Sequence, residues 1–261
     1  MGITFNGRHS DEFGVCMRTV SIPIIPPKRQ TILEVQGRDG KYVFEDRYDN
    51  IQIELAGTIP GDEIFDRRKK ARKIAAWLSG IGKLVFDYEN DIEYQVVKIT
   101  NDINATMFSR QYKDEFTVIF ECEPYQSQVL YGDGLTWEDT NTPWQNTDIP
   151  WEGYKRIFLV SSGETINVVN IGTYKALPII ILTGTAENVT IGDFTFANLS
   201  GTIYIDCKNQ VVYSISSGSK INKIANFSGD FLELVPGTNS FLISGTITTL
   251  LIEFDYKATY L

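Results

Sequence analysis

Apolar and polar residues alternate in short runs along most of this sequence, and a period of two restricts the chain mainly to β-strands. Residues 51–59 show the pattern most clearly, with apolar side chains at Ile51, Ile53, Leu55 and Ile59. Residues 115–122 repeat it, with apolar side chains at Phe116, Val118, Phe120 and Cys122. The sequence therefore predicts a mainly β protein whose strands each bury one face.

Two hairpins are predicted in the first half of the chain. Residues 31–36 and 41–45 flank the turn GRDG at 37–40, and residues 83–86 and 94–99 flank the acidic turn at 87–91. The turn region offers acidic side chains at a two-residue spacing, which is one feature of calcium loops: Asp87, Glu89, Asp91 and Glu93. An exposed acidic hairpin tip is the preferred interpretation, because alternate residues of a strand point to opposite faces and the glycine of a calcium loop is absent.

One α-helix is predicted over residues 62–79. Its apolar stripe comprises Ile64, Ala71, Ile74, Ala75 and Leu78. Acidic residues in the first turn suit the helix dipole, and Gly80 and Gly82 end the segment. The run RRKKARK at 67–73 has the composition of a nucleic-acid patch, but with acidic residues beside it we interpret it as a solvated helix face.

The charge pattern divides the chain in two. Residues 1–126 carry 17 Lys+Arg and 20 Asp+Glu, whereas residues 127–261 carry 7 and 13. We expect domains at 1–128 and 154–261, joined by a linker at 129–153 that contains prolines and three evenly spaced tryptophans, Trp137, Trp144 and Trp151. These tryptophans are interpreted as anchors of the linker, with a sugar-stacking platform as the alternative.

About nine short strands are predicted after residue 154, which favours an antiparallel β-sandwich. The ranges include 157–160, 165–170, 178–182, 202–206, 210–213, 231–234, 241–244 and 249–256.

Few catalytic or metal-binding schemes are open to this composition. The chain has three widely spaced cysteines, which we expect to be buried, and a single histidine, His9, expected in an exposed loop. No cofactor, metal ion or catalytic residue is predicted. The formal net charge of −9 opposes non-specific binding to nucleic acid. No apolar run approaches the ~20 residues that span a bilayer, and the N-terminus lacks the pattern of a secretory signal, so we expect folding in a cytoplasm.

Taken in order, several segments resemble the distal tail protein family of siphophages, the long-tailed bacteriophages. In the first half these are FNG at 5–7, VQGRDG at 35–40, IAAWL at 74–78, LVFD at 84–87, YQV at 94–96 and FTVIFECEPY at 116–125. In the second half they are NIG at 170–172, ALPII at 176–180, IYIDC at 203–207, VVY at 211–213 and LVPGTN at 234–239.

This resemblance implies an N-terminal, tail-tube-like, ring-forming β domain with one helix and a C-terminal galectin-like β-sandwich. It implies a structural protein and not an enzyme, located at the tail tip of the virion and made in the host bacterial cytoplasm. The expected assembly is a hexameric ring that joins the tail tube to the tip and lets DNA pass without binding it specifically. Interface residues are expected at Arg38 and Asp39 of the hairpin and at the three linker tryptophans.

The partners that the resemblance implies are the tail tube protein, the tape-measure protein, and a tail-associated lysin or receptor-binding and baseplate proteins. No membrane is expected among them. Two alternatives stay open at this stage. One is a carbohydrate-binding or cell-wall-degrading protein with two β domains, and the other is a tail tube subunit.

Overall fold

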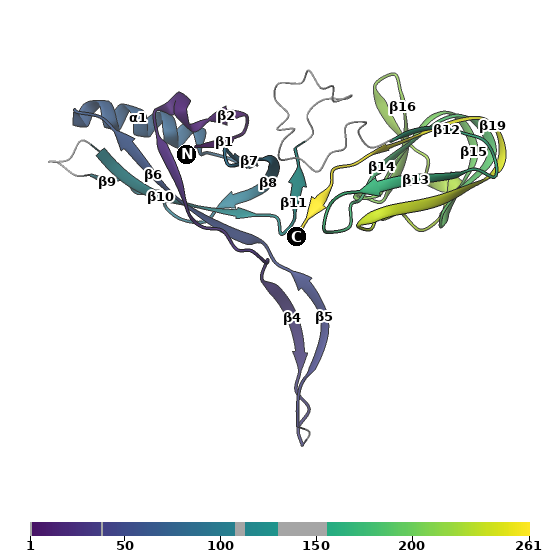
Figure 1. The fold of residues 1–261 in the computed structure, drawn as a ribbon, viewed down its shortest axis with the longest axis horizontal. Helices are drawn as coiled ribbons and strands as arrows, with labels where there is room; N and C mark the ends of the chain where they lie inside the picture. Colours follow the sequence, from purple (N-terminus) through teal and green to yellow (C-terminus); the bar gives the residue numbers. More distant parts are fainter. Residues whose placement is uncertain (1, 38, 108–112, 130–155) are drawn as a thin grey trace. The chain divides into compact units, whose positions relative to one another are not determined.

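The computed structural model describes residues 2–37, 39–107, 113–129 and 156–261 of the chain. The chain divides into two compact units, of which unit 1 comprises Met1–Val129 with Leu261, and unit 2 comprises Leu130–Tyr260. The described residues are mostly in antiparallel strands and contain one α-helix, α1 (Ile64–Trp77) (Figure 1). The predicted mainly β fold with one α-helix is therefore confirmed. Within the described residues, no helix has both the length and the apolar character needed to cross a bilayer.

Unit 1 is built on an antiparallel sheet with the strand order β2-β1-β7-β8-β10-β6-β3. The strands of this path are β1 (Ile3–Phe5), β2 (Arg8–His9), β3 (Cys16–Ser21), β6 (Ile51–Pro60), β7 (Gly82–Phe86), β8 (Glu89–Ile99) and β10 (Lys113–Cys122). Two short strands, β9 (Thr106–Met107) and β11 (Gln126–Gln128), pair with β10 and β8. A separate two-stranded sheet consists of β4 (Lys28–Leu33) and β5 (Tyr42–Tyr48).

The core of unit 1 follows from the alternation in the sequence. The odd-numbered apolar side chains of β6 and the even-numbered ones of β10 lie on one face and are buried. Trp77 of α1 stacks on Phe13 of the short helix η1 (Ser10–Phe13), and its indole N–H donates to the carbonyl oxygen of Phe5 at 3.1 Å. The helix is thereby held against one end of the sheet.

The buried face of α1 differs from the predicted stripe. Ile74 and Leu78 are buried as expected, but Ile64 and Ala75 are exposed. Arg67 is buried instead, so the basic run is only partly a solvated face. The reason is electrostatic, because Asp114 of β10 is buried beside Arg67 and pairs with it.

The acidic hairpin turn is shorter than predicted. Phe86 pairs with Glu89, so the turn consists of residues 87 and 88, and Glu89 already belongs to β8. Asp91 likewise lies in β8. The acidic side chains that the sequence placed at a loop tip are therefore mostly strand residues.

Unit 2 contains an antiparallel sheet with the strand order β12-β19-β14-β15-β16-β17, to which β13 and β18 add by pairing with β19 and β15. The eight described strands of this sheet are β12 (Ile157–Val160), β13 (Thr165–Asn170), β14 (Ile179–Ile191), β15 (Phe194–Asp206), β16 (Val211–Ser216), β17 (Ser219–Asn222), β18 (Phe227–Gly229) and β19 (Gly237–Asp255). The short strand β20 (Thr259–Tyr260) follows outside this sheet. A short helix, η2 (Ile224–Asn226), precedes β18. Side chains from β12 to β16 and from β19 enclose one hydrophobic core.

The prediction of short strands in this unit was wrong for its largest elements. The range 241–244 and all but the last residue of 249–256 belong to the single long strand β19, which ends at Asp255. Residues 231–234 form no strand apart from a bridge at Leu234. Glycines within the long strands explain why the sequence pattern predicted several shorter strands. At Gly184 and Gly245, φ is +151° and +132°, and a Cβ would lie 2.0 and 1.8 Å from a neighbouring carbonyl oxygen. These strands continue through positions where the side-chain alternation is interrupted.

Two buried asparagines explain the motifs NIG at 170–172 and LVPGTN at 234–239. The amide of Asn170 donates to the carbonyl oxygens of Tyr174 and Leu234 and accepts from the N–H of Gly172. Asn239 accepts from the N–H of Val235 at 2.9 Å and donates to its carbonyl oxygen at 2.8 Å. These side chains add hydrogen bonds to backbone groups of the turns that they hold.

Candidate assembly interface

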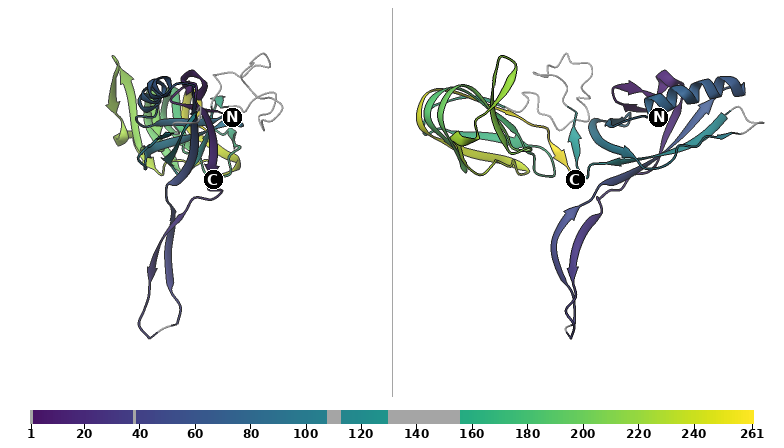
Figure 2. Two further views of the ribbon diagram at one scale, coloured as in Figure 1. Left: turned by 90° about the vertical axis from the view of Figure 1, so that its left-hand side faces the viewer. Right: turned by 180° about the vertical axis from the view of Figure 1, so that it is seen from behind.

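The β4–β5 hairpin, called the arm below, extends away from the main sheet of unit 1 (Figures 1 and 2). Among the described strands, these two pair only with each other, from Lys28 opposite Tyr48 to Leu33 opposite Tyr42. All six residues of β4 are exposed. An isolated two-stranded hairpin is marginally stable in water, so an arm of this kind needs contacts beyond its own two strands.

Both faces of the arm are apolar. Leu33, Tyr42 and Phe44 lie on one face, and Ile32 and Val43 on the other, because neighbouring strand residues alternate. Their exposed fractions run from 43% for Tyr42 to 56% for Val43. The segment that leads into the arm adds Ile24 and Ile25, exposed to 91% and 64%. Apolar surface on both sides of one ribbon is typical of a segment buried between other protein surfaces.

Polar contacts fix the base of the arm. The N–H of Asp49 donates to the carbonyl oxygen of Pro27 at 2.7 Å, and the guanidinium of Arg29 pairs with the carboxylate of Asp49 at 3.0 Å. The hydrogen bond from Arg29, aided by the N–H of Asn50, lowers the pKa of Asp49. Asn50 in turn donates to Glu121 of β10 at 2.8 Å. The arm is thus joined to the main sheet through hydrogen bonds at its base.

The interface residues predicted from the sequence are placed only in part. Asp39 lies exposed at the tip of the arm, whereas Arg38, Trp137, Trp144 and Trp151 lie outside the described residues. Sequence reasoning missed the apolar residues of the arm itself. The sequence does contain a signal of two apolar faces, because apolar residues are consecutive at 32–33 and at 42–44. A strand with only one buried face would instead alternate apolar and polar residues.

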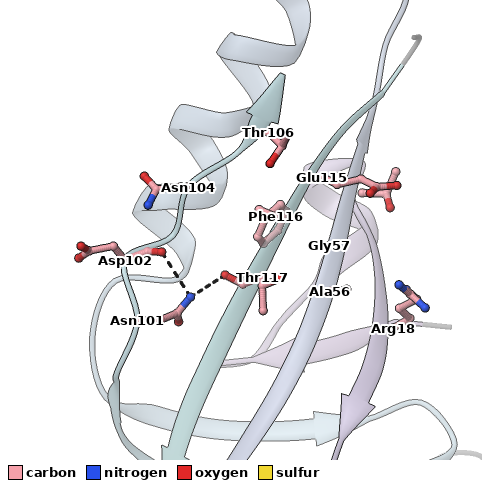
Figure 3. A pocket seen from close by; sticks show the side chains of 11 residues that line it. Arg18, Ala56, Gly57, Asn101, Asp102, Asn104, Thr106, Glu115, Phe116 and Thr117 are labelled. Carbon is pink, nitrogen blue, oxygen red and sulfur yellow. Dashed lines mark hydrogen bonds between the residues drawn. The ribbon is translucent and has the colours of Figure 1, made fainter. Parts of the chain in front are cut away.

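The main sheet of unit 1 also carries a polar pocket of about 290 Å³ (Figure 3). Asn101, from the segment after β8, donates to the carbonyl oxygen of Thr117 and accepts from the N–H of Ile119. Arg18, Asp102 and Glu115 supply charge, and no histidine or cysteine is among the described residues that line the pocket. An ion pair with Lys113 lowers the pKa of Glu115, so this carboxylate is ionised at neutral pH and unsuited to act as a general acid.

The acidic residues considered for calcium bind different partners. Asp87 lies 3.0 Å from Nε2 of His9, Glu89 accepts from the hydroxyl of Tyr94, and Glu93 pairs with Lys83. Burial raises the pKa of Glu89. Within the described ranges, no three His, Cys, Asp or Glu side chains gather as a metal site. The prediction of an exposed loop histidine was wrong, because His9 ends β2, is partly buried, and accepts at Nδ1 from the N–H of Asp11 to cap η1.

The cysteines occupy two kinds of environment. Cys122 and Cys207 are buried as predicted, and burial raises the pKa of each thiol to about 12. Cys16 is exposed, so the prediction was wrong for this residue. It lies on β3, where its side chain points away from the core that buries Met17.

Comparison with known proteins agrees with the fold. Residues 14–122, which include the arm, match the family model described as phage tail protein RIFT-related domain. No curated protein sequence matches the chain. Among solved structures, the Dit (gp 19.1) protein of phage SPP1, described as a paradigm of the hub adsorption apparatus in phages that infect Gram-positive bacteria, is similar with a TM-score of 0.70. The two sequences are 12% identical, and the match covers 100% of this chain and 99% of that chain.

The activated baseplate of phage p2 with Sr is less similar, with a TM-score of 0.42 and 10% identity over 97% of this chain and 96% of that one. The family match covers the unit that carries the arm, and the similarity to the SPP1 protein extends through both units. Residues 14–122 therefore match the phage tail protein RIFT-related domain, and the chain has the fold of the SPP1 Dit protein, in agreement with the resemblance found in its sequence.

Proposed function

We propose that this chain is a structural subunit that assembles with copies of itself into a ring, a hexamer, at the distal end of a siphophage tail. The ring joins the tail tube to the tip apparatus, and it has no catalytic role. The observation that carries this proposal is the arm, whose apolar side chains are exposed on both faces.

Burial of the arm between neighbouring subunits removes both of its apolar faces from water. A large apolar side chain contributes about 1.5–3 kcal/mol when it passes from water into a packed interface. Five such side chains on one ribbon are Ile32, Leu33, Tyr42, Val43 and Phe44. A head-to-tail arrangement, in which each subunit receives one arm and extends another, closes into a ring when the rotation between subunits is a simple fraction of a turn.

The charge of the chain supports the passage of DNA through such a ring. With 33 acidic and 24 basic residues, the subunit repels the phosphate backbone on average. A duplex that crosses an assembly of acidic subunits is then not retained by non-specific contacts. Purified protein is expected to leave double-stranded DNA unshifted in a gel at low salt, and retention of the DNA would contradict this part of the proposal.

Tail tube, tape-measure, and lysin or receptor-binding proteins are the partners we propose for the two faces and the rim of the ring. The fold shared with the SPP1 hub protein supports this location at the tail tip. Subunits made in the bacterial cytoplasm would join the virion tail there, with no membrane partner.

Electron microscopy of the purified full-length protein tests the ring. We expect closed rings of uniform diameter, and we expect their loss when Ile32, Val43 and Phe44 are all replaced by serine. A matched control is Leu159→Ser, which removes an apolar side chain exposed to 78% in unit 2. Rings that persist without the apolar arm residues would reject the arm as the assembly element. Turnover of cell-wall glycan by the purified chain would instead favour the hydrolase alternative.

A further inference from the structure

The β16–β17 hairpin lies in a stretch of unit 2 that has basic but no acidic residues. No acidic residue occurs between Asp206 and Asp230, and this stretch contains Lys208, Lys220 and Lys223. The whole chain has a net charge of −9, so a segment of 23 residues with three lysines and no carboxylate side chain is a local reversal of sign. Such a reversal favours contact with an acidic surface.

The hairpin also presents apolar side chains on both faces. Ile215 lies opposite Lys220, and Ile221 lies opposite Ser214, so the two isoleucines are on different faces. They are exposed to 51% and 45%, and Ile224 just beyond the hairpin is exposed to 42%. The tight turn at Ser217 and Gly218, both with positive φ, fixes the register of the two strands.

Strand β17 ends the order of its sheet. Within the described part of the chain it pairs with β16 alone, and all four of its residues are exposed. The outer edge of such a strand presents backbone N–H and C=O groups to which a further strand can add.

The aromatic residues of this face are not arranged for stacking on a sugar or a base. The rings of Tyr204 and Tyr213 stack on each other with centroids 5.2 Å apart, and the ammonium of Lys220 lies 4.1 Å from the centroid of the Tyr213 ring. Tyr204 of β15 and Lys220 of β17 thus both lie against the ring of Tyr213. A free aromatic face is what glycan or single-stranded nucleic acid would need.

We infer that the outer edge of β17 binds an acidic, partly apolar strand of another protein, which extends the sheet of unit 2. Backbone hydrogen bonds along β17 hold the added strand. In an added strand whose side chains alternate, the carboxylates lie on the face of Lys220 and the apolar side chains lie on the opposite face, beside Ile221. This inference does not depend on ring formation, because the arm belongs to unit 1 and the hairpin to unit 2.

Fluorescence anisotropy with synthetic peptides tests the inference on the full-length chain. The probe is a labelled peptide that alternates glutamate and valine, and the comparison peptides are its lysine–valine counterpart and polyglutamate. We expect binding of the glutamate–valine peptide alone, weakening as salt is raised. Reversing both charges, in Lys220→Glu with Lys223→Glu, is expected to weaken binding about tenfold or more. Ile221→Ser weakens it separately, through lost apolar contact.

Matched controls lie elsewhere in unit 2. Lys175→Glu reverses the charge of a lysine that pairs with Glu233, and Leu242→Ser removes a comparably exposed apolar side chain. Both are expected to leave peptide binding unchanged, and so is Phe44→Ser in the arm. Circular dichroism confirms that each variant is folded.

Several results would overturn the inference. Equal binding of the lysine–valine peptide would show that charge does not select the partner. Polyglutamate or polyphosphate binding as tightly as the peptide would show a surface for polyanions and not for a protein strand. Self-association that is lost in Ile221→Ser would assign the edge to a second copy of this chain.

Discussion

The Nε of Arg67 lies 3.1 Å from Oδ1 of Asp114, and the two side chains are exposed to only 2% and 1%. The same guanidinium donates from Nη1 to the carbonyl oxygen of Gly61 at 2.8 Å. The pair therefore joins α1 to the start of β10 and to the segment that leads into the helix. A charge in this position is tolerated only because its partner is buried with it.

Removing one member of this pair should destabilise unit 1 strongly. Asp114→Ala leaves the guanidinium of Arg67 buried without its carboxylate, and the expected loss in the free energy of unfolding is about 3–5 kcal/mol. Urea denaturation followed by the fluorescence of the tryptophans measures it. The control is Glu115→Gln on the next residue, whose exposed pair with Lys113 is worth at most about 1 kcal/mol.

Replacing both members should restore most of that loss. Arg67→Met with Asp114→Leu removes both charges together and keeps apolar volume at the site, a change that is often neutral or stabilising in proteins. A double variant as unstable as Asp114→Ala would show that the hydrogen bond to Gly61, and not the ion pair, dominates.

The base of the arm should depend on pH. The pKa of Asp49 is below its ordinary value of 3.8, so its ion pair with Arg29 is complete above that pH and is lost as the pH falls through the lowered pKa. Carboxyl chemical shifts recorded by NMR during acid titration should give a midpoint for Asp49 below 3.8. Arg29→Ala should raise that midpoint, and an unchanged midpoint would assign the effect to the N–H of Asn50 alone.

The three cysteines should differ in reactivity. At pH 8, a thiol with a pKa of about 12 is ionised in only about one molecule in ten thousand, so Cys122 and Cys207 should resist a thiol reagent in the native protein. Cys16 is exposed and should react. Titration with a chromogenic disulfide is expected to find one thiol per chain in the native state and three in denaturant. The Cys16→Ser variant should give none in its native state, and any rapid reaction there would contradict the burial of the other two.

The amide of Asn239 should be essential for unit 2. Its Nδ2 donates to the carbonyl oxygens of Val235, Gly237 and Val168, at 2.8, 3.1 and 3.4 Å. Each buried backbone group left without a partner costs about 1–3 kcal/mol, so Asn239→Leu should lower the stability of unit 2 by at least about 2 kcal/mol. The exposed Asn167 is the control, since Asn167→Ala should change stability by no more than about 0.5 kcal/mol. Thermal unfolding by calorimetry compares the two.

The regular strands of both units could be predicted because their alternation reflects burial of one face. The strand at residues 51–59 is found as β6, and the ranges 157–160 and 165–170 coincide with β12 and β13. The long strands β14, β15 and β19 were not recognised, since their polar central portions and glycines lack the continuous pattern that sequence reasoning follows. Whether a strand continues through such a stretch is decided by pairing with distant strands.

The candidate interface could be predicted only in outline. The arm was recognised as a hairpin, but the sequence directed attention to the turn residues Arg38 and Asp39 and away from the apolar faces. Consecutive apolar residues can belong to a buried strand or to an exposed one awaiting a partner, and local sequence does not distinguish the two. The burial of Arg67 could not be predicted from local sequence either, because its partner Asp114 is 47 residues away in the chain.

The mass of the full-length protein in solution, measured by light scattering over a range of concentrations, tests the central claim most directly. We predict a closed assembly of six 29.5 kDa subunits that falls to a single subunit when Ile32, Val43 and Phe44 become serine, with unit 1 still folded. A protein that stays a single subunit at high concentration, with tail tube protein added, would contradict the account.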